Sequence, residues 1–374
     1  GYVGTVFVPV LDENGKSVAL VGADISMHEM LKSRQRFVLR TILTSVLTVG
    51  ALVAIYLLYL QRRLVSPLRN LTASVASYVR AQDKPRYVPA DIHTHDEVET
   101  LSDAFSQMAE DMREYIDHLR AATAEKQRIQ TELDVARDIQ LSMLPNVFPP
   151  FPECDEFSIY ATIDPAKEVG GDFYDFYRLD ENRLCFLIAD VSGKGVPAAL
   201  FMMIARALLK NEMQEGGTPA EVMETVNGQL CEGNEQSMFV TALVMVLDTK
   251  AHTLRYVNAG HNPPLLRRAG GSFEYMSLRR SPPLAVVPGK KYEGVTIPFA
   301  SGDTLFLYTD GVTEALNPRE ELYGEERLRA ALNESAGDAE PTGLIGDVTR
   351  ALAQYVQGAT QADDITMLAV KATR

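Results

Sequence analysis

Four aspartates in this sequence each follow an apolar run and lie near glycine or beside a second aspartate. They are Asp172, Asp190, Asp310 and Asp363. Apolar runs of this length are typical of β-strands, so we expect the four carboxylates to meet at strand ends. Carboxylates at short range repel one another, and divalent cations relieve that repulsion. Because every donor is an oxygen, the pattern predicts a site for Mg²⁺ or Mn²⁺ rather than Zn²⁺.

The elements that must position these residues lie in the C-terminal part of the chain. The apolar runs predict strands over residues 157–163, 183–188, 239–247, 253–257, 304–308 and 365–370. Helix-like segments alternate with them at residues 198–214, 219–232, 326–332 and 343–357. This pattern predicts an α+β fold in which mostly antiparallel sheets form a sandwich covered by helices.

Five motifs in this region resemble one known family. They are Gly-Gly-Asp-Phe-Tyr-Asp at 170–175, Ala-Asp-Val-Ser-Gly-Lys-Gly at 189–195, Asn-Ala-Gly-His-Asn-Pro-Pro-Leu at 258–265, Thr-Asp-Gly-Val-Thr-Glu at 309–314 and Asp-Asp-Ile-Thr at 363–366. Their order is that of bacterial metal-dependent serine/threonine phosphatases of the PPM family, in the sporulation stage II E and RsbU-like branch. The resemblance implies a PPM-type antiparallel β-sandwich flanked by helices over residues 151–374.

The resemblance also implies a metal centre with two divalent ions, Mn²⁺ or Mg²⁺. Its ligands and catalytic residues would be the four aspartates named above, with the backbone carbonyl of Val191 as a further ligand. Asp364 would support the adjacent aspartate, and Glu314 would approach a more weakly held ion. The implied reaction is in-line hydrolysis by a metal-activated water, with no covalent enzyme intermediate.

Three other polar residues near these motifs have competing interpretations. We interpret Asp175 as a solvated or capping carboxylate rather than a ligand. His261 is a candidate general acid, but a turn histidine bonded to the backbone is the favoured interpretation. Lys167 is a weaker candidate for a phosphate contact, since no arginine precedes Gly170 at the position that animal relatives use.

The sequence of the first part of the chain is typical of a membrane protein. Residues 1–36 contain two β-rich runs around a turn, similar to the closing hairpin of an extracytoplasmic sensor domain. The chain begins with Gly1, and we interpret it as a fragment whose front end is missing. Residues 37–60 are predicted to form a transmembrane helix, because residues 41–60 carry no charge and about 20 helical residues cross a bilayer.

Residues 61–114 resemble a HAMP signalling domain, in which two amphipathic helices flank a connector at residues 83–89. Its second helix carries an apolar stripe at spacings of three and four, formed by Val98, Leu101, Phe105, Met108 and Met112. Residues 115–150 are predicted to form a coiled-coil linker, whose helix ends at Leu144 and Pro145. The resemblance implies a homodimer joined through the HAMP helices and the coiled coil.

These features predict a sensor phosphatase in a bacterial inner or plasma membrane, with its catalytic domain in the cytoplasm. The implied substrate is a phosphoserine or phosphothreonine protein, by resemblance a STAS-type anti-sigma-factor antagonist. A catalytically weak phosphatase-like domain that binds a partner is the alternative. A diguanylate cyclase fits poorly, because Phe173 stands where that chemistry needs an acid. The net charge of −14 argues against nucleic acid as a partner.

Overall fold

The computed structural model describes residues 3–80, 87–335 and 340–374. Gly1 and residues 83–86 of the predicted HAMP connector lie outside the described residues. The chain divides into two compact units, Gly1–Ala124 and Glu125–Arg374.

The first unit opens with an antiparallel hairpin of β1 (Val3–Leu11) and β2 (Ser17–Ser26). At its turn, the Asp12 carboxylate accepts backbone N–H groups from Asn14 and Lys16. Helix α1 (Met27–Leu60) follows and passes through a short π-helical segment (Gln61–Val65) into α2 (Ser66–Arg80). A hairpin followed by a helix agrees with the sequence-based expectation for residues 1–60.

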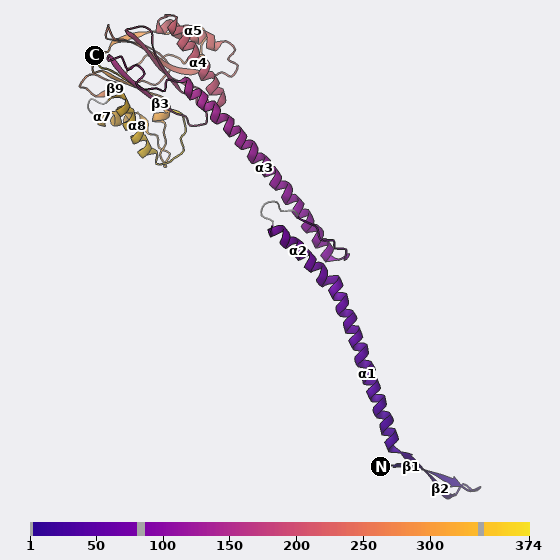
Figure 1. The fold of residues 1–374 in the computed structure, drawn as a ribbon. Coiled ribbons are helices and arrows are strands. Elements are labelled where there is room, and N and C mark those ends of the chain that lie inside the picture. The colour runs from indigo at the N-terminus through magenta and orange to yellow at the C-terminus, as the bar shows by residue number, and fades with distance from the viewer. Residues whose placement is uncertain (1–2, 81–86, 336–339) are drawn as a thin grey trace. The chain divides into compact units, whose positions relative to one another are not determined.

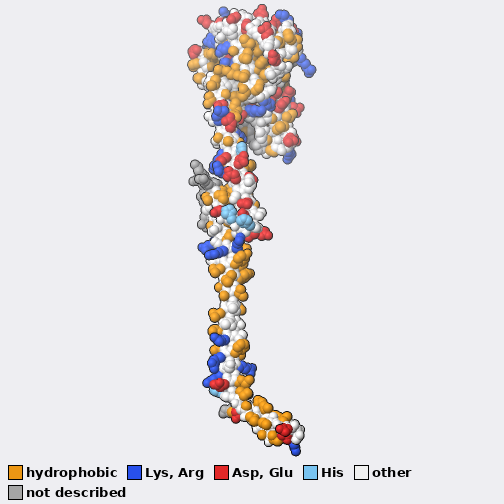
Figure 2. All heavy atoms as spheres, turned by 90° about the vertical axis from the view of Figure 1, so that its right-hand side faces the viewer, with side chains coloured by type: hydrophobic (Ala, Val, Ile, Leu, Met, Phe, Trp, Pro, Cys, Tyr) orange, Lys and Arg blue, Asp and Glu red, His pale blue; other side chains and the backbone are white. Residues whose placement is uncertain are grey.

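Helix α1 is exposed along its length, and its residues 41–60 carry no charged side chain. The helical run Met27–Tyr78 contains a window of mean hydropathy 2.2, none of it buried, so one helix is long and apolar enough to cross a membrane. Figure 2 shows this helix as an orange, hydrophobic band with blue, basic side chains at both ends. An exposed apolar surface of this size is costly in water and stable in lipid.

Helix α3 (Glu97–Met143) covers both the second predicted HAMP helix and most of the predicted linker. It ends just before Leu144 and Pro145, where the sequence predicts the break. Along its first part, Leu101, Met108 and Met112 of the predicted apolar stripe are exposed.

The second unit is built on two five-stranded antiparallel sheets. The first has the order β10 (Val295–Pro298), β7 (Thr253–Ala259), β6 (Val240–Asp248), β5 (Arg183–Val191), β4 (Phe173–Arg178). The second has the order β3 (Phe157–Asp164), β12 (Ile365–Ala372), β11 (Thr304–Tyr308), β8 (Leu265–Arg267), β9 (Phe273–Tyr275). The predicted α+β class with antiparallel pairing is confirmed.

Helices cover both sheets (Figure 1). Helices α4 (Val196–Gln214) and α5 (Pro219–Cys231) pack on the first sheet, and α7 (Gly324–Glu334) and α8 (Pro341–Val356) pack on the second. Helix α5 starts at a capping box in which Thr218 and Glu221 satisfy each other's backbone N–H groups. Fully buried side chains such as Phe186 and Leu307 fill the core of this unit.

Candidate metal centre

The four predicted ligands come from four strand ends, two in each sheet. Asp172 immediately precedes β4, and Asp190 is the next-to-last residue of the neighbouring strand β5. Asp310 follows β11 and opens the one-turn helix α6 (Asp310–Thr313), while Asp363 lies just before β12, which pairs with β11. The topology therefore brings together residues up to 191 positions apart in the sequence, as the spacing of apolar runs predicts.

Burial and mutual repulsion dominate the electrostatics of this cluster. Asp172 is buried and accepts a 2.6 Å hydrogen bond from the Thr309 hydroxyl; its burial and the charge of Asp190 raise its pKa well above the usual value. Burial and the charge of Asp310 raise the pKa of Asp190 to about 7. The carboxyl of Asp190 is therefore partly protonated near pH 7, which limits the repulsion within the cluster. Burial, then Glu314 and Asp363, raise the pKa of Asp310.

Asp364 holds the backbone beside Asp172. Its carboxylate accepts N–H groups from Ala166 at 2.8 Å and from Gly171 at 2.7 Å, across almost 200 residues of sequence. A Cβ at Gly170 would lie 2.4 Å from Asp364 Oδ2, and one at Gly311 would lie 2.0 Å from the Asp364 carbonyl oxygen. Only glycine lets both segments approach Asp364 this closely.

Both carboxylate oxygens of Asp363 have partners. Oδ1 accepts the backbone N–H of Asp364 at 3.0 Å, and Oδ2 lies 2.8 Å from the Lys194 ammonium. Lys194 also donates to the carbonyl oxygen of Ala362 at 2.6 Å. Lys194 was not predicted as a site residue, although its place between two glycines, close to Asp190, could have indicated one.

The donor chemistry fits hard divalent cations, although the side chains are not yet arranged around one. No group of three or more His, Cys, Asp or Glu side chains within residues 3–80, 87–335 and 340–374 is placed to hold a metal ion. The cluster is nevertheless anionic and made of oxygen donors. Asp172 is buried and the other three aspartates are partly buried, and protonation and a lysine offset the repulsion among them. The Val191 carbonyl oxygen, 2.9 Å from where a Gly171 Cβ would stand, lies beside this cluster. Divalent cations would replace those protons and the lysine.

Comparisons with known proteins identify the family of the second unit. The family model for stage II sporulation protein E (SpoIIE) matches residues 180–373, just over half of the chain. The chain belongs to the SpoIIE family. A curated relative, protein IcfG of Synechocystis sp., is 30% identical over 266 residues, which cover 64% of this chain and 41% of IcfG.

Phosphoserine phosphatase RsbP of Bacillus subtilis is 29% identical over 193 residues, or 50% of this chain and 47% of RsbP. The chain thus spans about half the length of these curated relatives. Among solved structures, the SiaA-PP2C domain of Pseudomonas aeruginosa superposes with a TM-score of 0.58 at 24% identity, covering 66% of this chain and 98% of that domain. That likeness shows a shared SpoIIE/PP2C-type fold.

The structure corrects the interpretation of Asp175. This carboxylate is fully buried on β4 and lies 2.7 Å from the Arg206 guanidinium of α4, rather than in solvent or at a helix cap. Its burial raises its pKa, while Arg206 and Lys210 lower it. Residues 172 and 175 share one short segment, so the ion pair connects α4 to the strand that follows Asp172. An arginine ten residues into a helix gives no sequence signal for this pairing.

His261 is a buried turn histidine, as favoured from the sequence. Its backbone N–H donates to the Asn258 side chain at 2.8 Å, and its ring contacts the Thr241 hydroxyl at 2.8 Å and the Tyr308 carbonyl at 3.2 Å. Burial lowers its pKa to about 4, so the ring is neutral near pH 7. Since both ring nitrogens have protein partners, His261 positions the end of β11 rather than delivering a proton to substrate.

Gln140, near the end of α3, contacts the same glycine-rich segment. Its amide Nε2 donates to the Gly170 carbonyl at 2.7 Å, and its Oε1 accepts the Gly170 N–H at 3.2 Å. Gln140 is buried, with 4% of its surface exposed. From the sequence, this segment was predicted only as part of a coiled-coil linker, with no role for Gln140.

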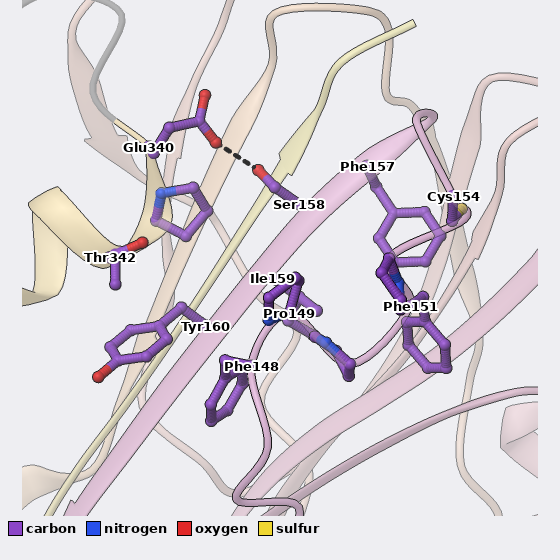
Figure 3. Close-up of a pocket in the computed structure, with 13 residues that line it drawn as sticks. Phe148, Pro149, Phe151, Cys154, Phe157, Ser158, Ile159, Tyr160, Glu340 and Thr342 are labelled. Carbon is purple, nitrogen blue, oxygen red and sulfur yellow. Dashed lines mark hydrogen bonds between the residues drawn. The ribbon is translucent and has the colours of Figure 1, made fainter.

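A separate pocket of about 350 Å³ opens beside the edge strand β3 (Figure 3). Phe148, Phe151 and Tyr160 line it, and Ser158 donates a 2.9 Å hydrogen bond to Glu340 across it. None of the candidate metal ligands contributes to its lining. The pocket is therefore distinct from the acidic cluster and has no place in the metal chemistry.

Proposed function

We propose that this chain is a metal-dependent protein serine/threonine phosphatase. The convergence of Asp172, Asp190, Asp310 and Asp363 at four strand ends carries this proposal. Burial and neighbouring carboxylates raise the pKa values of the first three. Family membership supports it, because RsbP and RsbU, named phosphoserine phosphatases, are relatives of 29% identity.

In this proposal the four aspartates and the Val191 carbonyl would hold two Mn²⁺ or Mg²⁺ ions, with Glu314 beside a more weakly held one. When bound, the ions would lower the pKa of water and neutralise phosphoryl charge. The protein itself contributes the fixed positions of the ligand groups. Asp364 fixes the Gly171 and Asp172 backbone, and Thr309 orients the Asp172 carboxylate. A rigid, partly dry arrangement of this kind limits reorganisation during the reaction.

The substrate class we propose is a phosphoserine- or phosphothreonine-bearing regulator, and the specific candidate is a STAS-type anti-sigma-factor antagonist. We further propose that residues 1–36 end a sensor domain, that residues 37–60 span a bacterial inner or plasma membrane, and that residues 151–374 lie in the cytoplasm. The exposed apolar length of α1 supports the span.

Residues 61–114 and 115–150 are proposed to act as HAMP helices and a coiled-coil linker in a homodimer. Exposed Leu101, Met108 and Met112 on α3 support this, since an apolar stripe needs a covering surface.

The direct test is phosphate release by the full chain in detergent, with Mn²⁺ and a phosphorylated STAS-type protein. We expect Asp172→Asn and Asp310→Asn each to lower kcat at least about a hundredfold, the scale for losing an electrostatic group in an active site. Asp138→Asn, an exposed change on α3, is the matched control. Binding of the phosphoprotein without any phosphate release would favour the partner-binding alternative instead.

A further inference from the structure

Lys194 lies in the loop that joins β5 to α4, a few residues after Asp190. Gly193 and Gly195 on either side of it have φ angles of 87° and 77°, values that glycine adopts without strain. This backbone carries the lysine side chain across to the segment that precedes β12. There its ammonium meets two oxygens, the Ala362 carbonyl and Asp363 Oδ2.

Each carboxylate oxygen of Asp363 already has one partner. Oδ1 accepts the Asp364 N–H, which belongs to the local backbone, and Oδ2 faces the Lys194 ammonium. The Lys194 ammonium already lies 2.8 Å from Oδ2. A divalent ion bound to that atom would lie within a few ångströms of the ammonium, and their like charges would repel.

We propose that Lys194 is a built-in counter-ion that occupies Asp363 in the metal-free protein and must release it before a divalent cation binds there. This inference rests on the metal centre of the proposed function. Lys194 stabilises the acidic cluster while it is empty, and it opposes metal binding by the same amount. The two effects are equal because a contact that is present only in the metal-free protein is lost when the metal binds, and its free energy is subtracted from that of metal binding.

The test is calorimetric titration of the full chain in detergent with Mn²⁺ alone. Lys194→Met keeps the apolar stem of the side chain and removes the charge. We expect the Kd for Mn²⁺ to fall about two- to fivefold, the range for a partly exposed ion pair. The Tm of the metal-free protein should fall, and the Tm gain on adding Mn²⁺ should grow.

Two further variants make the comparison specific. Lys250→Met removes the same charge at an exposed turn between β6 and β7, so it controls for the change in net charge. Asp363→Asn reports Mn²⁺ bound elsewhere on the chain, and in its background Lys194→Met should leave the Mn²⁺ affinity unchanged.

Equal Mn²⁺ affinity in wild type and Lys194→Met would overturn the inference, as would the absence of any Mn²⁺ binding. A raised KM for phosphoprotein at unchanged Mn²⁺ affinity would also overturn it and would place Lys194 on the substrate. A tighter Mn²⁺ site in a chain that releases no phosphate would support the inference while refuting the phosphatase proposal, so the two failures are distinguishable.

Discussion

Replacing Gln140 by methionine tests how the end of α3 holds the backbone next to Asp172. Methionine matches the length of glutamine but can make neither hydrogen bond to Gly170. Each bond contributes about 1 kcal/mol net, and each stranded backbone group of Gly170 costs about 1–3 kcal/mol if it stays buried. With two such bonds and two such groups, we therefore expect this contact to weaken by about 2–6 kcal/mol.

A local loss of this size is best measured at the Gly170 amide itself. Hydrogen exchange, followed by mass spectrometry of peptides that span residues 165–175, reports how often that segment opens. Because 1.4 kcal/mol is a factor of ten, even the lower value predicts roughly thirtyfold faster exchange. Gln127→Met on the exposed surface of the same helix is the matched control, and its exchange should equal that of the wild type.

The expected consequence for activity follows from the same geometry. Gly170 precedes Asp172 by two residues, so a looser segment should raise the concentration of Mn²⁺ needed for half-maximal activity. If Gln140→Met leaves both the exchange of residues 165–175 and the Mn²⁺ requirement at wild-type values, Gln140 does not position this segment and the reasoning is wrong.

Three other perturbations have defined outcomes. Because the folded-state pKa of Asp190 is raised, the metal-free protein loses stability as the pH rises from about 4 to 7. Asp190→Asn should therefore have a higher Tm than the wild type between pH 5 and pH 8. With Mn²⁺ added, the wild type should have the higher Tm. Arg206→Met should lower the free energy of unfolding, measured by chemical denaturation, by about 3 kcal/mol, because it leaves Asp175 buried without its arginine partner. Adding Asp175→Asn to this variant should recover most of the lost stability. Gly311→Ala should give little folded protein by circular dichroism, since its Cβ would lie 2.0 Å from the Asp364 carbonyl oxygen.

Much of the second unit was predictable because its strands are long apolar runs with clear ends. Strands β3, β5, β6, β7, β11 and β12 all fall where the sequence places them. Strand β4 was missed because Phe173–Arg178 carries Asp175 in its middle and shows no alternation, being buried along nearly its whole length. Strands β8, β9 and β10 have only three or four residues each, too few for a periodic signal.

At the candidate site, the gathering of the four aspartates was predictable but their partners were not. Aspartates beside glycines stand out in a sequence because few structural roles require both. Arg206, Lys194 and Gln140 act through contacts with residues 31, 169 and 30 positions away, and such pairing depends on tertiary placement. The Asp175 interpretation failed for this reason, because nothing local to that residue indicates a buried arginine.

The position of Asp172 is fixed mainly by contacts to its neighbours' backbone. Asp364 accepts N–H groups from Gly171 and Asp172 on one side, and Gln140 pairs with both polar groups of Gly170 on the other. Asp364 belongs to the acidic cluster, and Gln140 belongs to the end of helix α3. A shift in the last turns of α3 would therefore reach Asp172 through a single glycine, with no need to deform either sheet. If the cluster binds metal as proposed, this short connection would give α3 a physical route to its metal affinity.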